Sequence, residues 1–196
     1  MSRGLGDVYK RQIVKKELDA FLEAKVPQVK FVDRTFNCNR QRAIDIWSYL
    51  VEHDNGITNF HFEISSDLLG EEELELFAKM RPGLIQLEIG VQSTNGETVD
   101  AIHRHMDLDK LFHYVDRVHE LGNIHQHLDL IAGLPYENYE RFGCSFDDLY
   151  AHEPDQLQLG FLKVLKGTMM EEEVKKYSIL YLSLIHISEP TRHSLI

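Results

Sequence analysis

Polar and apolar residues alternate along several short stretches of the chain. In residues 84–94 the two faces of an extended strand differ sharply: Ile85, Leu87, Ile89 and Val91 form one face, and Gln86, Glu88, Gly90 and Gln92 form the other. The same alternation occurs in residues 59–64, 124–131 and 156–164. The sequence therefore predicts strands that each have one apolar face and one polar face.

Segments with helical spacing separate these strands. The predicted helices cover residues 13–24, 40–53, 71–80, 108–122, 139–150 and a short stretch at 169–177, and the predicted strands cover 29–37, 59–64, 84–94, 124–131 and 156–165. Asp107 can cap the start of the helix at 108–122, and Gly122 suits its exit. Because helix-containing connections join parallel strands, this order predicts an α/β fold with about five parallel strands.

The polar faces suggest how the sheet is used. A parallel sheet covered by helices on both faces consists of continuous apolar strands, which these are not. We expect a partial (βα) barrel, an open curved sheet with helices on its outer face and a polar, ligand-holding inner face. A sheet with one hydrated face, or a polar core whose side chains satisfy one another, are the alternatives. Active sites of barrels lie at the carboxyl ends of the strands, which favours a set of polar residues there: Asp33, Glu63, Gln92, Ser93 and Asp129.

Composition narrows the range of functions. The 196 residues carry a net charge of −11, so binding to nucleic acid is not expected. The sequence contains no apolar run long enough to span a membrane and no signal peptide, and its two cysteines, Cys38 and Cys144, form no metal-type cluster. We expect a cytoplasmic protein in a reducing compartment, with a small molecule or an unknown substrate as its partner.

Four motifs occur in barrel order, and together they carry a family resemblance. "FEISSDLL", "EIGVQST", "IHRH" and "DLIAGLPYE" resemble the radical S-adenosylmethionine (SAM) superfamily, particularly its cobalamin-associated branch. "VKFVDRTFN" and "LQLGFLKVLKGT" resemble a less characterised subfamily in which a cobalamin-binding domain precedes the barrel. The resemblance implies that the parent protein binds SAM and a 4Fe-4S cluster, and possibly cobalamin. It further implies that the parent generates a 5'-deoxyadenosyl radical.

The resemblance also assigns residues to SAM. Glu63, Gln92, Arg104 and Asp129 match the positions that contact the ribose and methionine parts of SAM. Gly133 belongs to the Ile-x-Gly-Leu-Pro turn that follows the acidic residue, and the backbone near Leu162 and Lys163 would flank the adenine. The chemistry is suitable, because ribose hydroxyls bind to carboxylates and amides, and a carboxylate binds to the forked donors of Arg.

One part of the family pattern is missing. The cluster-binding loop of the family is Cys-x3-Cys-x2-Cys, and neither Cys38 nor Cys144 fits it. Residues 1–12 and 181–196 resemble translated sequencing adapters, so we expect two non-native tails around a barrel at 13–180. On this interpretation the chain is a fragment that lacks the first strand and the cluster loop. It would be inactive alone, and its missing N-terminal part would be its natural partner.

Two further interpretations remain open at this point. His125, His127 and Asp129 share one strand face, with His61, Glu63 and Glu88 able to point into the same interior, which is typical of some metal-dependent barrel hydrolases. The two histidines of "HRH" could form another metal pair, although we favour the SAM role of Arg104. Alternatively, the chain is a non-catalytic binding fragment.

Overall fold

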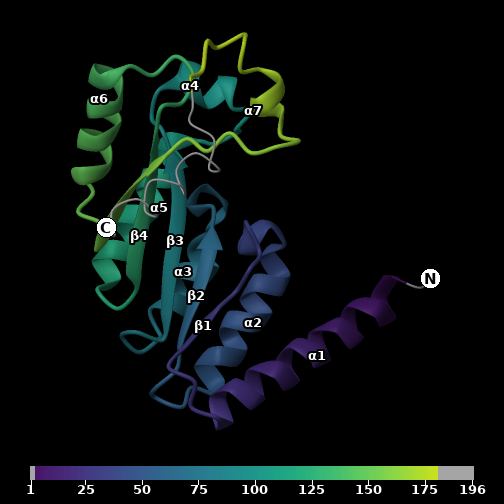
Figure 1. Ribbon diagram of the computed structural model, residues 1–196. Helices are drawn as coiled ribbons and strands as arrows, with labels where there is room; N and C mark the ends of the chain where they lie inside the picture. Colours follow the sequence, from purple (N-terminus) through teal and green to yellow (C-terminus); the bar gives the residue numbers. More distant parts are fainter. Residues whose placement is uncertain (1–2, 181–196) are drawn as a thin grey trace, which may run out of the picture.

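The computed structural model describes residues 3–180, with side chains from residue 12 onward. Its centre is one parallel sheet of five strands: β1 (Gln28–Lys30), β2 (Asn59–Ile64), β3 (Ile85–Gln92), β4 (His125–Ala132) and β5 (Gln156–Phe161). The strands lie side by side in chain order, and every neighbouring pair is parallel. The sheet curls into a half-barrel (Figure 1), which confirms the predicted fold class.

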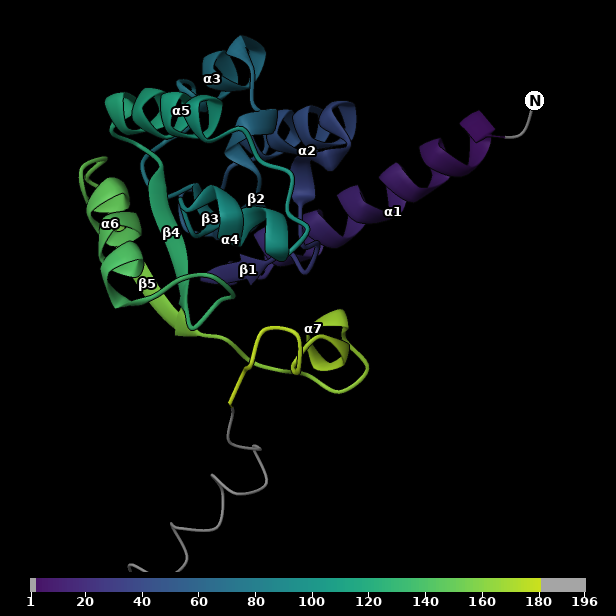
Figure 2. The same cartoon turned by 90° about the horizontal axis from the view of Figure 1, so that it is seen from above.

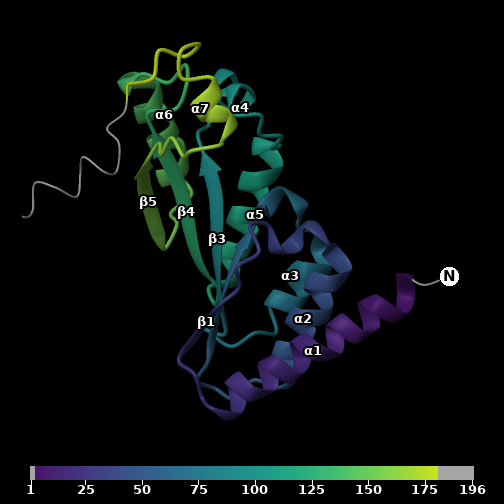
Figure 3. The same cartoon turned by 45° about the vertical axis from the view of Figure 1, so that its right-hand side comes forward.

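Helices lie between successive strands, and one more helix stands at each end of the element order. They are α1 (Arg3–Glu23), α2 (Arg40–Glu52), α3 (Glu71–Phe77), α4 (Gly96–Ala101), α5 (Leu108–Leu121), α6 (Tyr139–Tyr150) and α7 (Met169–Glu172). Viewed from above in Figure 2, α2, α3 and α5 lie together on one side of the strands, and α7 lies on the opposite side. Figure 3 shows the first half of α1 extending away from the remaining elements. The inner face of the sheet is the face away from α2, α3 and α5, and no comparable layer of helices packs on it.

The apolar faces of the strands pack against these outer helices. Phe60, Phe62, Leu87, Ile89 and Leu128 are all at most 1% exposed. Trp47 of α2 is fully buried, and its ring centroid lies 5.0 Å from that of Phe77 on α3. Burying a side chain of this size contributes roughly 1.5–3 kcal/mol to the free energy of unfolding, so this layer is the main source of stability.

Several predicted boundaries agree closely with the structure. Strand 59–64 and helix 139–150 match β2 and α6 residue for residue. Asp107 accepts a hydrogen bond from Lys110 N at 3.0 Å, and Gly122 ends α5 in the left-handed region at φ 66°. Both caps of this helix are therefore confirmed.

The predicted strand at 29–37 is wrong in length. β1 has three residues. One further backbone hydrogen bond to β2 follows it, from Phe31 N to His61 O at 2.9 Å. Beyond it the chain leaves the sheet and forms a short 3-10 helix, η1 (Phe36–Cys38). Phe36 is fully buried there, with ring centroids 4.4 Å from Phe62 and 5.5 Å from Trp47. The tertiary packing of Phe36 therefore outweighs the local strand preference.

Other differences concern short or terminal elements. α4 and a second 3-10 helix, η2 (Ser66–Leu68), were not predicted, because single-turn helices carry little periodicity. α7 covers only part of the predicted 169–177. α1 starts at Arg3 rather than at residue 13, so the predicted helix is too short at its start. The non-native origin of residues 1–12 stays a prediction. The predicted tail at 181–196 lies outside the described residues.

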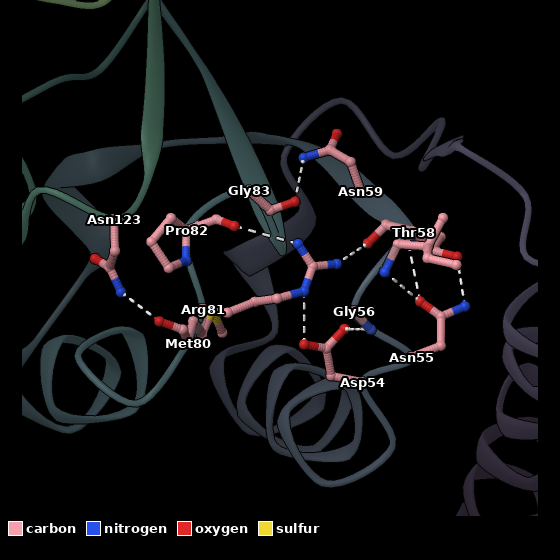
Figure 4. Close-up of polar contacts among 11 residues, drawn as sticks. Asp54, Asn55, Gly56, Thr58, Asn59, Met80, Arg81, Pro82, Gly83 and Asn123 are labelled. Carbon is pink, nitrogen blue, oxygen red and sulfur yellow. Dashed lines mark hydrogen bonds and ion pairs between the residues drawn. The ribbon is translucent and has the colours of Figure 1, made fainter.

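A polar network closes the end of the sheet where the strands begin (Figure 4). Arg81 Nε donates to Asp54 Oδ2 at 2.7 Å, and its terminal nitrogens donate to the carbonyl oxygens of Thr58 and Pro82. Asn59 Nδ2 donates to Gly83 O at 3.0 Å, which joins the start of β2 to the turn before β3. These contacts fix the amino-terminal ends of β2 and β3. The carboxyl ends of the strands remain free to form a site.

Candidate functional site

The parallel register places the polar side chains of the inner face in rows across the strands. His61 pairs with Gln86, Glu63 pairs with Glu88, and Glu88 pairs in turn with His127. The next row toward the carboxyl ends pairs Gly90 with Asp129, and Asp129 with Gln158. Polar residues that are far apart in the sequence thus converge on one face, as the alternation predicted.

Glu88 lies at the centre of these rows. Lys30 Nζ donates to Glu88 Oε2 at 2.7 Å, and His61 Nε2 lies 2.8 Å from the same oxygen. Burial opposes ionisation of Glu88, but the hydrogen bond and charge of Lys30 outweigh it and lower the pKa of this carboxyl group. Burial lowers the pKa of both His61 and His127, so these rings favour the neutral form. The result is an ionised carboxylate in contact with Lys30 and the neutral His61 ring, with the neutral His127 at the paired position on β4.

Asp129 and Glu63 are the carboxyl groups with raised pKa values. Burial raises the pKa of Asp129 to about 7, and the charges of Glu88 and Glu63 contribute to the increase. Burial, followed by the charge of Glu88, likewise raises the pKa of Glu63. His127 Nε2 lies 3.0 Å from Asp129 Oδ1, but neither atom has a partner with hydrogen-bonding geometry. Buried carboxyl groups that titrate near neutral pH are common at functional sites.

Gln92 and Arg104 meet above Gly90. The ladder between β3 and β4 shifts register between Gly90 and Gln92, and Gln92 takes a left-handed conformation at φ 73°. A Cβ atom on Gly90 would collide with the Gln92 amide and would lie 3.7 Å from the Arg104 guanidinium, which donates to Gly90 O. Bulges of this kind reorient side chains next to active sites. The structure therefore assembles Gln92 and Arg104 one register position from Asp129.

Two of the predicted site residues have structural partners. The Ser93 hydroxyl is fully buried and donates to Glu137 Oε1 at 2.5 Å, while it accepts from Asn95 N at 3.0 Å. Asp33 accepts from both terminal nitrogens of Arg42 on α2, at 3.1 and 3.4 Å. The Ser93 contacts join two loops, the Asp33 contact joins a loop to α2, and a ligand role for either residue stays a prediction.

The remaining predicted residues lie at the ends of β4 and β5. Gly133 has φ 88°, and a Cβ placed on it would lie 3.8 Å from Leu162 Cβ. Leu162 N donates to Ala132 O at 2.9 Å, and Lys163 beside it is exposed. Next to Gly133 is a pocket of about 550 Å³, lined by residues 133–138, Arg141 and residues 177–180. Gly133 thus joins the end of β4 to a pocket, and an adenine role for the backbone near Leu162 and Lys163 stays a prediction.

The metal-site alternative is not supported. Across residues 12–180 no group of three or more His, Cys, Asp and Glu side chains is arranged to hold a metal ion. His125 is the first residue of β4 and lies four residues before Asp129, with its Nδ1 4.0 Å from Asp155. A strand rises about 3.3 Å per residue, so His125 and Asp129 are too far apart to share one ion.

The two cysteines do not form a cluster site. Cys38 ends η1 and Cys144 lies on α6, and both are exposed free thiols. A 4Fe-4S cluster is held by several thiolates arranged around one centre. These residues do not fit that requirement.

No helix among residues 3–180 is long and apolar enough to cross a membrane.

The five parallel strands and their polar inner face define a partial (βα) barrel. A sequence profile of the Radical SAM superfamily matches residues 2–149, and the chain belongs to that superfamily.

Curated relatives and solved structures agree with this assignment. The chain is 31% identical over 107 residues to the oxygen-independent coproporphyrinogen III oxidase of Salmonella typhimurium. The aligned segment covers 52% of this chain and 23% of that protein. The chain is 29% identical over 115 residues to the coproporphyrinogen-III oxidase-like protein HemZ of Bacillus subtilis, covering 58% and 22%. The chain thus spans about a quarter of the length of these relatives.

Two solved structures share the fold. The radical SAM methyltransferase TsrM from Kitasatospora setae, with cobalamin and a 4Fe-4S cluster bound, superposes with a TM-score of 0.73 at 16% identity, over 85% of this chain and 33% of that one. HemN from Escherichia coli, a coproporphyrinogen III oxidase, superposes with a TM-score of 0.59 at 22% identity, over 79% and 38%. At these identities the likeness shows the fold alone.

Lys30 is a site residue that was not among the predicted ones. Its side chain crosses from the first strand to Glu88 on the third. The register pairs Lys30 with His61, and Val29 and Phe31 on either side of it are apolar. Alternation along β1 is therefore the signal that places Lys30 on the polar face.

The raised pKa of Asp129 leads to a testable pH dependence. An unfolded Asp titrates near pH 3.9, so between about pH 4 and pH 7 the folded chain retains a proton that the unfolded chain releases. Stability from this group is therefore present below about pH 4 and is lost as the pH rises to 7. The Asp129→Asn variant has no carboxyl group to ionise and does not lose this stability. We expect its free energy of unfolding to exceed that of the wild type at pH 8, with a smaller difference at pH 5.

Urea unfolding at the two pH values measures this effect. Asp147→Asn, the same change at an exposed position on α6, is the control and should show no such trend. An Asp129→Asn difference that is constant with pH would show that Asp129 titrates normally.

Proposed function

We propose that the inner face of the half-barrel binds SAM and forms the SAM-binding part of a radical SAM enzyme. The observation that carries this proposal is the convergence of Glu63, Gln92, Arg104 and Asp129 at the carboxyl ends of β2, β3 and β4. Asp129 Oδ1 is buried without a hydrogen-bond partner, and a ribose hydroxyl would satisfy it. Membership in the superfamily makes SAM the natural ligand for this arrangement.

Each residue has a role that suits its chemistry. Glu63 and Asp129 accept hydrogen bonds from the ribose hydroxyls, and the Gln92 amide serves the methionine part. Arg104 uses one terminal nitrogen for Gly90 O, which leaves other donors of its guanidinium for the methionine carboxylate. Gly133 lines the pocket at the end of β4, and the backbone of Leu162 and Lys163, just after β5, would flank the adenine.

The chain's two cysteines do not fit a 4Fe-4S cluster. A thiolate-bound cluster would need cysteines beyond Cys38 and Cys144. We propose that the parent protein supplies them, and that the whole protein carries out radical chemistry on a small substrate. Association with cobalamin, which TsrM binds, stays a prediction for this protein.

Calorimetry tests the SAM proposal. We expect weak binding, with a Kd on the order of 0.1–1 mM, because the ribose and carboxylate contacts are present without a cluster to chelate the methionine end. S-adenosylhomocysteine, which lacks the sulfonium methyl group, is the comparison ligand and should bind to a similar extent. An absence of any SAM-dependent heat at millimolar concentration would contradict the proposal.

A further inference from the structure

Below the SAM residues, the inner face contains polar atoms that no protein contact satisfies. Only 6% of the His127 surface is exposed, and its Nε2 atom has no partner with hydrogen-bonding geometry. The same is true of His61 Nε2, although Glu88 Oε2 lies 2.8 Å from it. Buried polar atoms without such partners are uncommon in proteins and indicate a missing ligand or water.

Three carboxyl groups gather on this face. Glu63 and Glu88 lie directly opposite each other on neighbouring strands, an arrangement of like charges that destabilises a sheet. Asp129 adds a third carboxyl group in the next row, and burial keeps it partly protonated near neutral pH. The charges of Arg104 and Arg34 act on Glu63, whereas the cation in contact with Glu88 is Lys30. The ionised form of Glu88 therefore depends on an ammonium group at the Lys30 position.

Lys30 is the contact most easily replaced. It comes from β1 at the edge of the sheet, and its side chain is 51% exposed, whereas the Glu88 side chain is 16% exposed. A half-exposed ammonium on a flexible stem can rotate into water at little cost, because exposed ion pairs contribute little to stability. The ammonium of Lys30 thus occupies a position that another ammonium could take.

We propose that Glu88, flanked by His61 and His127, binds a protonated amine of the substrate, which replaces the Lys30 ammonium. Glu88 Oε2 accepts the charged hydrogen bond, and the rings of His61 and His127, on the neighbouring strands, border the position of the amine. This site lies one row from Asp129, so the amine would hold its substrate beside the proposed SAM position. The inference rests on the proposed function and adds the substrate class, a cationic amine rather than a carboxylate.

The test uses n-butylammonium chloride as the probe and sodium butyrate as its anionic counterpart, at equal ionic strength. Binding to the full chain is followed by NMR of the His61 and His127 ring nitrogens. We expect butylammonium, and not butyrate, to shift these signals. Lys30→Gln should tighten butylammonium binding about threefold to tenfold, because the competing ammonium is gone, and Glu88→Gln should weaken it at least about tenfold.

Matched controls are available on α3 and just beyond it. Glu75→Gln and Lys79→Gln make the same changes at exposed positions and should leave probe binding unchanged. Thermal unfolding shows whether Glu88→Gln folds, and the gain expected for Lys30→Gln does not depend on that variant. Equal probe binding by Glu88→Gln and the wild type, weaker binding by Lys30→Gln, or a preference for butyrate would overturn the inference.

SAM calorimetry on the same variants separates the two proposals. Lys30→Gln and Glu88→Gln should bind SAM as the wild type does, since neither residue belongs to the SAM set. A wild type that binds butylammonium at Glu88 but not SAM would overturn the proposed function. A wild type that binds SAM but shows no Glu88-dependent amine binding would overturn only this inference.

Discussion

Anaerobic treatment of this chain with iron and sulfide will not produce one 4Fe-4S cluster per chain. Such a cluster requires several thiolates around one centre, and the chain contributes two cysteines on separate elements, η1 and α6. Iron and sulfide analysis together with the visible absorption spectrum measures the outcome. We expect iron far below four atoms per chain after desalting.

The double variant Cys38→Ser and Cys144→Ser provides the control. It should retain as little iron as the wild type, which would show that the residual metal is nonspecific. A stoichiometric cluster that disappears in this variant would mean that the two thiols do support cluster assembly. The statement that these residues do not fit a cluster would then be wrong.

Arg104→Ala should abolish measurable SAM binding. The guanidinium is placed for the methionine carboxylate, and a hydrogen bond to a charged group contributes about 1.5–3 kcal/mol, or roughly tenfold to hundredfold in Kd. Starting from millimolar or submillimolar affinity, such a loss moves binding beyond the range of calorimetry. The reason for the large effect is that Arg104 is the cation nearest Gln92 and Gly90.

The control separates ligand binding from folding, since Arg104 also donates to Gly90 O. Arg117→Ala removes another arginine, which pairs with Glu71 on the outer helices, and should leave SAM affinity unchanged. Thermal unfolding of Arg104→Ala tests whether the lost carbonyl contact affects the fold. Unchanged SAM affinity in a folded Arg104→Ala protein would remove this residue from the site.

The elements that the sequence predicts well have a strong local signal. β2 and β3 alternate strictly, so their boundaries and their polar faces follow from residue order. α5 carries both a cap at Asp107 and a left-handed glycine at its end, and these fix its limits. Convergence of Glu63 and Asp129 follows as well, because parallel strands bring their carboxyl ends to one edge.

Features that depend on tertiary contacts could not be predicted. The burial of Phe36 against Trp47 shortens β1, and no local pattern reveals that packing. The bulge that turns Gln92 depends on the register between β3 and β4, and the Lys30–Glu88 contact depends on strand order. The pKa of Asp129 depends on burial and on neighbours from other strands. Each of these is a property of the assembled sheet.

The most direct test of the central claim is a SAM titration of the isotopically labelled chain followed by residue-resolved NMR. The account predicts saturable shifts at Glu63, Gln92, Arg104 and Asp129, with smaller shifts at Gly133 and Leu162. Residues on the outer helices, such as Arg117 and Glu71, should not move. Saturable shifts confined to the outer helices, or no shifts at millimolar SAM, would contradict the claim that the inner face of the half-barrel is a SAM site.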